Sequence, residues 1–311
     1  MVASTRNSIA LGVFLAIGIA AVVRPKPNPK EAPLSAEIVE DREDAVSSPP
    51  PDREPPPKSG ARRRRIAKVL IAAGVVLAAY SAAVIFWKDP ATDLYARWRQ
   101  HELAGQLEDA FAAYAASLAT PQELPATQQE IIDLERERVE AAANRAQERL
   151  RLGKPLGRIV VPELDVNAIF VHGTRWGPDL SQGPGHYAET SLPGVGRTTA
   201  IAAHRTTFGA WFRHIDDLRG GDSIAIRLPY ATFTYHVFGH KIVDNDDWSI
   251  IRDRGFDTLV LSACHPLYSA SHRWVVFAAL TRVEPTKGTP YLVDRQNRVR
   301  PVSSSSLAVA G

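Results

Sequence analysis

The chain contains a single cysteine, Cys264, which follows the apolar run 258–263. Without a second cysteine, this thiol cannot form an intrachain disulfide. It is therefore either an inert buried group or a reactive one, because a thiolate is a strong nucleophile. A cysteine nucleophile also needs a base, a proton donor for the leaving group and a group that stabilises the oxyanion.

Two other residues have the chemistry to complete such a site. His204 follows the apolar run 199–203, so its side chain emerges where a strand ends. Arg273 begins the apolar run after Cys264, with eight residues between them, and two paired strands would bring both to one end of a sheet. A guanidinium there could donate hydrogen bonds to an oxyanion. His265 is a poor partner, because adjacent strand residues point to opposite faces. A surface histidine and an ordinary surface arginine remain the alternatives at this point.

The region from Gly153 onward predicts a mainly β domain. Its apolar runs are short and are separated by turn signals, which is typical of a closed or nearly closed all-β domain. The predicted strands are two within 158–171 that are broken at Pro162, then 198–203, 222–228, 231–238, 241–243 and the two runs around Cys264. We place the domain at 153–285 and expect 286–311 to be a C-terminal tail, disordered from Ser303.

Residues 89–152 predict helices ahead of this domain. Apolar residues recur near helical spacing over 94–114, before a proline-containing break. Thr127 and Glu130 then offer a capping box for a second helix. Because 131–150 is rich in alanine and charge, we expect a solvated extracellular stem or, alternatively, a coiled-coil partner surface.

One segment has the length and composition of a membrane span. Residues 69–87 are nineteen residues without a charge, which is enough to cross a bilayer core as a helix. We predict a transmembrane helix at 69–88, with Trp87 and Lys88 as interfacial anchors. The arginine block 62–65 on its N-terminal side predicts a cytoplasmic N-terminal flank. The catalytic domain would then lie on the extracellular face of the plasma membrane. A buried core helix is the alternative.

The first 68 residues carry a second apolar run and a proline-rich region. Residues 9–23 form a possible short membrane segment within 1–23, with a signal-peptide core or a misassigned start as alternatives. Residues 24–68 hold ten of the 23 prolines and charges of both signs, which predicts a disordered cytoplasmic region. The net charge of +3 comes from local blocks and does not indicate a nucleic-acid partner.

Three stretches of the β domain match a known family in order and spacing. They are Gly183–Tyr187 with Leu192–Gly194, Ala202–Gly209 with Ile215–Asp222, and Thr258–Pro266 with Ser269, Ala270 and Arg273. On these motifs the segment 157–280 resembles the sortase family of Gram-positive bacteria, and it looks closest to the class E sortases of actinobacteria. The match covers less than half of the chain and holds the histidine, cysteine and arginine in register.

The resemblance implies a fold and an activity. The implied fold is an eight-stranded sortase-type β-barrel, preceded here by the helical stem and the transmembrane helix. Cys264 would attack the threonine carbonyl of a C-terminal sorting signal of the LAxTG or LPxTG type. His204 would be the general acid and base that protonates the leaving amine, and Arg273 would hold the oxyanion or orient the substrate. The implied partners are surface proteins that bear the signal and an amine of a peptidoglycan precursor or pilin. Neither a cofactor nor a metal is implied.

The chain departs from the family pattern at two positions. Ala263 stands where the family usually has threonine, and Trp211 stands where relatives of this class often carry proline. We expect Trp211 to reshape the rim of the groove, and both departures to affect substrate preference more than the chemistry. A thiol hydrolase with water as the acceptor and a non-catalytic membrane-tethered scaffold remain the alternative functions.

An acidic cluster raises the question of calcium. Asp244, Asp246 and Asp247 precede Trp248 and could bind calcium, as in some sortases. Their spacing does not follow a regular ligand pattern, so we expect a solvated loop and assign no metal site.

Overall fold

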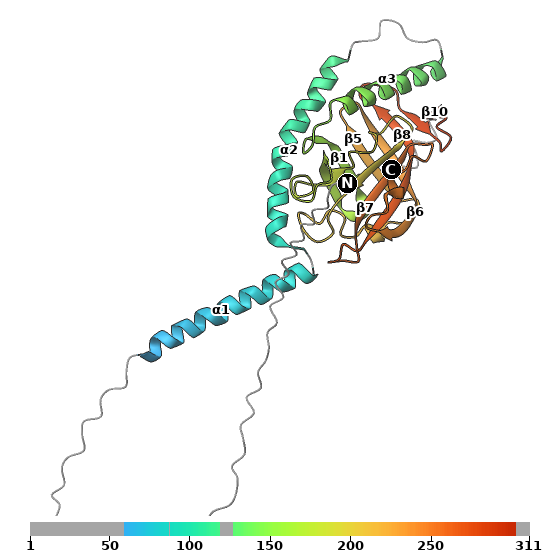
Figure 1. Ribbon diagram of the computed structural model, residues 1–311. Helices are drawn as coiled ribbons and strands as arrows, with labels where there is room; N and C mark the ends of the chain where they lie inside the picture. Colours follow the sequence, from blue (N-terminus) through green and yellow to red (C-terminus); the bar gives the residue numbers. More distant parts are fainter. Residues whose placement is uncertain (1–58, 87, 119–126, 303–311) are drawn as a thin grey trace, which may run out of the picture. The chain divides into compact units, whose positions relative to one another are not determined.

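The computed structural model describes residues 59–86, 88–118 and 127–302. The predictions for residues 1–58, Trp87 and the tail from Ser303 lie outside the described residues. Within these ranges the chain forms three helices followed by a β domain (Figure 1).

Eight strands in the described part of the chain close into a barrel. The described residues contain ten strands: β1 Pro155–Val161, β2 Val166–His172, β3 Gly185–His186, β4 Thr198–Ala202, β5 Ser223–Leu228, β6 Ala231–Asp244, β7 Thr258–His265, β8 His272–Pro285, β9 Tyr291–Val293 and β10 Val299–Pro301. Strands β1 to β8 form the barrel, and β9 and β10 extend the sheet from β8. Their order around the barrel is β8-β6-β5-β1-β2-β3-β4-β7, and β7 pairs with β8 to close it. The β2–β3 and β4–β7 pairs are parallel and the other pairs are antiparallel. The eight-stranded barrel expected from the resemblance is confirmed.

Most predicted strands are present, with one boundary error. Pro162 does break the first run, because a short 3-10 turn at Pro162–Leu164 separates β1 from β2. The two strands expected at 231–238 and 241–243 are instead one strand, β6, so that division was wrong. Bulges at Thr234/Tyr235 and Val237/Gly239 absorb the irregular residues without ending the pairing with β8. The short strands β3, β9 and β10 were not predicted.

Three helices precede the barrel: α1 Ser59–Phe86, α2 Pro90–Ser117 and α3 Gln128–Glu148. Only α3 begins where a start was predicted from the sequence. Helix α1 begins at Ser59, so the expectation of disorder was wrong for residues 59–68. The Asp89 side chain caps α2, and the predicted capping box of Thr127 and Glu130 is present at α3. Among the described residues, Gly60–Phe86 is the one helix that is long and apolar enough to cross a membrane.

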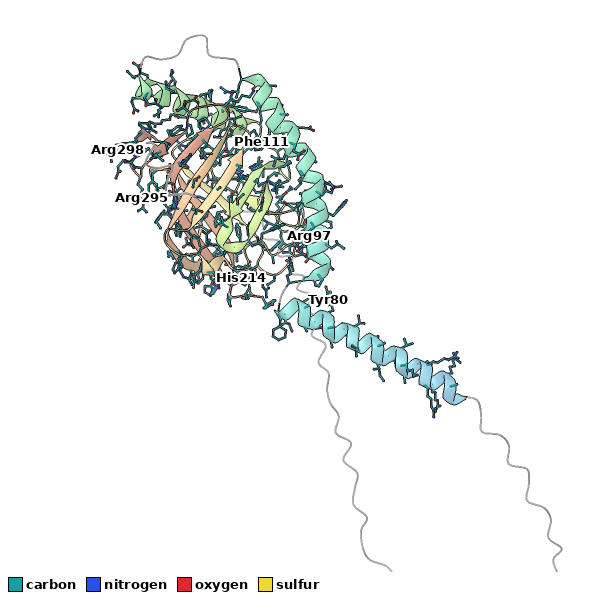
Figure 2. The ribbon with its side chains drawn as sticks, turned by 180° about the vertical axis from the view of Figure 1, so that it is seen from behind. Tyr80, Arg97, Phe111, His214, Arg295 and Arg298 are labelled. Carbon is teal, nitrogen blue, oxygen red and sulfur yellow. The ribbon has the colours of Figure 1, made fainter. Side chains whose placement is uncertain are left out.

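Both α2 and α3 pack against the barrel, as Figure 1 and, from behind, Figure 2 show. Ile132, Val139, Ala142 and Ala143 of α3 are buried in the same apolar cluster as the barrel interior. On α2, Leu103 and Leu107 pack with Ile169 and Val171 of β2 beside the partly buried Phe111. The expectation of a solvated stem at 131–150 was therefore wrong, because small alanines let a thin apolar stripe approach the barrel closely.

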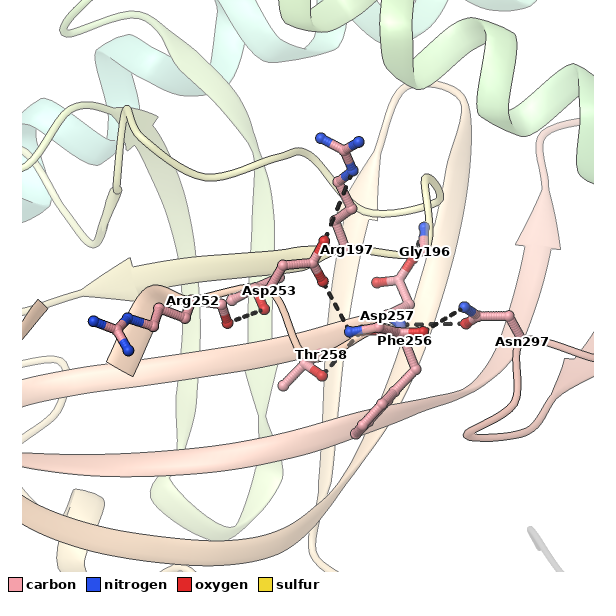
Figure 3. Close-up of polar contacts among 10 residues, drawn as sticks. Gly196, Arg197, Arg252, Asp253, Phe256, Asp257, Thr258 and Asn297 are labelled. Carbon is pink, nitrogen blue, oxygen red and sulfur yellow. Dashed lines mark hydrogen bonds and ion pairs between the residues drawn. The ribbon is translucent and has the colours of Figure 1, made fainter. Parts of the chain in front are cut away.

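A buried carboxylate, Asp257, fixes the start of β7 (Figure 3). Its Oδ2 accepts hydrogen bonds from the backbone N–H groups of Gly194 at 2.9 Å and Gly196 at 3.2 Å. Its Oδ1 accepts the hydroxyl hydrogen of Tyr235 at 2.8 Å. Burial raises the pKa of Asp257 to about 6, although these donors oppose the shift. The carboxylate therefore ties the β3–β4 connection and β6 to β7.

Candidate active site

The strand register brings His204, Cys264 and Arg273 to one side of the barrel. Cys264 of β7 lies directly opposite Arg273 of β8. On the other side of β7, Ala202 of β4 lies in parallel register with Ser262, and Ala203 N–H donates to Ser262 O at 3.2 Å. His204, two residues beyond Ala202, therefore lies level with Cys264. Ala203 and Ala263 point into the core, so their neighbours point outward.

All three side chains line one cavity of about 350 Å³. The rest of its lining comes from β4 and β7 and from the β2–β3, β3–β4, β6–β7 and β7–β8 connections. These residues include Thr174, Trp176, Leu180, Tyr187, Asn245, Asp246, Asp247, Trp248, Ile250, Ser262 and Ala270. Three residues predicted from three separate strands thus face a common space large enough for part of a peptide.

His204 is held as a buried imidazole with one free nitrogen. Its Nε2 is buried and has no hydrogen-bond partner. Burial lowers the pKa of His204, while a hydrogen bond to the backbone of Trp176 acts in the opposite direction. Because the neutral form is favoured, Nε2 can accept a proton from a thiol while the other ring nitrogen is occupied.

Aromatic side chains surround this imidazole. The ring of Phe208 lies 5.5 Å from that of His204, and Trp176 meets His204 edge-on at 6.4 Å. Trp176 was not predicted as a site residue. No chemical motif marks this position, because its role follows from the path of the β2–β3 connection over the end of β4.

The first turn of α2 supports the loop after His204. Phe208 N–H donates to Thr92 Oγ1 at 2.9 Å, and the Tyr95 ring lies 6.1 Å from that of Phe208. Phe208 and Ala210 have left-handed backbone conformations, with φ of 48° at each. Non-glycine residues pay a steric penalty in this region, so the contacts with α2 offset a local strain.

Arg273 keeps part of its guanidinium available. Its Nη1 donates to the backbone carbonyls of Ala270 at 3.1 Å and His272 at 3.0 Å. Within the described residues, Nε and Nη2 have no protein acceptor. The Arg273 fork is thus anchored by one nitrogen, and its other donors can bind an oxyanion in the cavity.

Tyr187 adds a hydroxyl to this group. The Tyr187 hydroxyl lies 3.4 Å from Ser262 Oγ and donates to it. Burial raises the pKa of Tyr187, while the hydrogen bond to Ser262 and the charge of Arg273 oppose the shift, so the hydroxyl stays protonated. The sequence motif 183–187 contains this tyrosine, but its type alone did not indicate a site.

The neighbours of Cys264 have structural positions. His265 points away from the cavity and packs on Trp274, with ring centroids 5.4 Å apart. The methyl group of Ala263 lies in the core. Trp211 also packs against the core and is not part of the cavity lining, so the expectation that it reshapes the groove rim was wrong.

The acidic residues near Trp248 make local contacts. Asp247 Oδ1 accepts the N–H of Ser249 at 2.9 Å, and Asp244 lies 3.4 Å from His272 Nε2. In the part of the chain that the structure describes, no group of three histidine, cysteine, aspartate or glutamate residues is arranged to hold a metal ion.

Comparison with known proteins assigns the β domain to a family. Residues 159–281 match the sortase domain. The chain is 31% identical over 140 residues to Sortase D of Bacillus subtilis, covering 44% of this chain and 69% of that protein. It is 27% identical over 154 residues to Sortase SrtE1 of Streptomyces coelicolor, covering 44% of each. The chain belongs to the sortase family, whose members are cysteine transpeptidases.

The chain is also similar to parts of solved sortase structures. Sortase E from Streptomyces avermitilis is 30% identical, with a TM-score of 0.40, and the match covers 44% of this chain and 94% of that chain. The SrtA sortase from Actinomyces oris is 27% identical, with a TM-score of 0.42 and coverage of 44% and 85%.

Proposed function

We propose that this protein is a membrane-anchored transpeptidase in which Cys264 is the nucleophile, His204 the general acid and base, and Arg273 the oxyanion donor. The observation that carries the proposal is their convergence from β4, β7 and β8 on one cavity, where His204 Nε2 has no other partner.

The first half-reaction forms a thioester. His204 Nε2 takes the proton of the Cys264 thiol, and the sulfur attacks the threonine carbonyl carbon of the sorting signal. The carbonyl oxygen becomes an oxyanion that receives hydrogen bonds from the free donors of Arg273. When this intermediate collapses, the C–N bond breaks and the imidazolium gives its proton to the leaving amine.

The second half-reaction transfers the acyl group to an amine. The neutral His204 accepts a proton from the incoming amine as its nitrogen attacks the thioester carbonyl. The C–S bond then breaks, and the sulfur regains a proton from His204. The product is an amide, so no external oxidant, reductant or metal is needed for the balance.

The substrates and the orientation belong to the same proposal. We infer a C-terminal signal of the LAxTG or LPxTG type on surface proteins, and an amine acceptor on a peptidoglycan precursor or pilin. Arginines 62–65 at the start of α1 favour a cytoplasmic N-terminal flank, which puts the barrel on the extracellular face.

The test uses the full chain in phosphatidylcholine nanodiscs with a signal peptide and a defined amine. The expected result is an amide product and an acyl-enzyme adduct on Cys264 detected by mass spectrometry. Free acid in place of amide, at saturating amine, would instead identify a thiol hydrolase. If Cys264 neither forms the adduct nor reacts with a thiol probe, the protein is a scaffold and the proposal fails.

A further inference from the structure

A second cavity lies between the helices and the barrel, away from the thiol. It has a volume of about 620 Å³ and shares no lining residue with the cavity around Cys264. Its walls come from the C-terminal half of α2, the end of α3, the start of β1 and the β5–β6 turn. This volume is in the range of pockets that bind small ligands.

The floor of this cavity is apolar, and its helical walls are built from small residues. Ala110 and Ala113 line it from α2, and Ala142 and Ala146 line it from α3. Because alanine side chains are short, the space beside them stays open as the cavity. Leucines, prolines and the edge-on pair of Tyr114 and Tyr230, 6.4 Å apart, complete the floor.

The rim of the same cavity is strongly basic. Its four cations are exposed and belong to the end of α3 and the segment that leads to β1: Arg145, Arg149, Arg151 and Lys154. Within the described residues none of them forms an ion pair, and no aspartate or glutamate lines the cavity. The helix dipole favours cations at the end of α3, but it does not account for Arg151 and Lys154, which lie beyond the helix.

We propose that this cavity binds an amphiphile with an apolar body and a phosphate headgroup. The body would cover the apolar floor, and the phosphate would receive hydrogen bonds from the guanidinium groups of the rim, whose fork matches phosphate oxygens. A neutral apolar ligand would leave the four cations of the rim without a counter-charge, and inorganic phosphate would leave the floor exposed to water. The apolar floor and the basic rim together therefore favour a molecule that has both an apolar body and a phosphate group.

Calorimetric titration of the full chain in phosphatidylcholine nanodiscs tests this site, with empty nanodiscs as the blank. Octyl phosphate should bind at least about ten-fold more tightly than inorganic phosphate, and octyltrimethylammonium should show no specific binding. Native mass spectrometry of the chain released from its membrane distinguishes the sources. A retained phospholipid identifies a membrane lipid as the ligand, and octyl phosphate binding without retained phospholipid identifies a soluble one.

Two variants separate the roles of charge and volume. R145A/R149A should weaken octyl phosphate binding at least about ten-fold. A113L places another good helix former at an exposed position of α2 and should do the same by filling the cavity. The matched control R254A/R300A removes two exposed arginines elsewhere and should leave binding unchanged. Equal binding by R145A/R149A, or equal affinities for inorganic and octyl phosphate, would overturn the proposal.

Discussion

The two ends of β7 are built on opposite principles. At the Asp257 end, both carboxylate oxygens have donors from the protein. At the Cys264 end, buried polar nitrogens lack partners; these are His204 Nε2, His265 Nδ1, Trp211 Nε1 and Trp274 Nε1. One strand thus carries a satisfied polar network at one end and unused hydrogen-bonding capacity at the other.

The backbone shows the same contrast. At the Asp257 end, left-handed conformations fall on Gly194 and Gly196, with φ of 103° and 73°, and on Asn297, with φ of 56°, a residue type that tolerates this region. At the Cys264 end they fall on Gly209 and also on Phe208, Ala210 and Tyr268, which tolerate it poorly. The Asp257 end of β7 is thus organised for stability, whereas the Cys264 end retains backbone strain and free hydrogen-bond donors that a substrate can use.

The largest expected effect comes from removing the thiol. C264A should lower transpeptidation by a factor on the order of 10⁴ or more, because no other group can form the thioester. The free energy of unfolding should change by less than about 1 kcal/mol, as measured by denaturant titration. Residual turnover close to that of the wild type would mean that another nucleophile acts, and that the Cys264 end of β7 does not carry the chemistry.

Substitution of Arg273 tests whether its free donors at the Cys264 end of β7 stabilise the oxyanion. R273K keeps the charge but loses the planar fork, so kcat should fall by roughly 10²–10³-fold. Steady-state kinetics with a signal peptide measures the effect, and R254K is the control at an arginine outside the cavity. A rise in KM at constant kcat would show that Arg273 binds the substrate without stabilising the oxyanion.

The Asp257 end should respond in stability and not in catalysis. D257A leaves two backbone N–H groups and the Tyr235 hydroxyl without their acceptor, which should cost roughly 2–4 kcal/mol of unfolding free energy. The kcat of the folded protein should stay within about 3-fold, because the far end of β7 is unchanged. A large loss of kcat without a loss of stability would show that the two ends are coupled.

The same carboxylate should make stability depend on pH. Its pKa is about 6 in the folded protein against 3.8 ordinarily, so the folded state binds the proton more tightly. Protonation of Asp257 therefore contributes about 3 kcal/mol to the free energy of unfolding below about pH 4, and this contribution is lost as the pH rises through 6. Denaturant titrations over this range measure it. D257N should remove the dependence, and an unchanged profile in D257N would assign it to other groups.

The smallest effect concerns the support of His204 by α2. T92V removes the acceptor of Phe208 N–H, which should lower kcat by roughly 3–10-fold. Because the imidazole would be less buried, the pKa of His204 should rise toward its ordinary value of 6.5, and the acid limb of the profile of kcat against pH should move up with it. T92S keeps the hydroxyl and should restore both values. Equal losses in T92S and T92V would point to packing instead of the hydrogen bond.

The strands could be predicted because local patterns encode them, whereas the eight-stranded barrel and the choice of His204, Cys264 and Arg273 rested on the resemblance to the sortase family. Short alternating runs mark the strands, and His204 and Arg273 stand where such runs end or begin. The prediction of two strands in place of β6 was wrong because glycine usually interrupts a strand, whereas at Gly239 a bulge keeps the pairing with β8 intact.

The missed features depend on contacts between distant segments. Trp176 and the residues around Trp248 reach the cavity through connections whose paths no local pattern determines. The α3 helix looks solvated because its charges outnumber its apolar residues, yet Ile132 and Val139 are fully buried against the barrel. Burial of a thin stripe is decided by the partner surface, and a single helix does not encode that surface.

The parallel pairing of β4 with β7 has a consequence for the order of folding. These strands are separated by the β5–β6 hairpin, so His204 and Cys264 meet only after a long loop has closed. Contacts of this kind form late, because the entropy of loop closure must be overcome before they are made. Strand β8 must then dock on β7 to bring in Arg273. Under the proposed function, a partly folded chain therefore presents a thiol without its base, and transpeptidation requires a completed barrel.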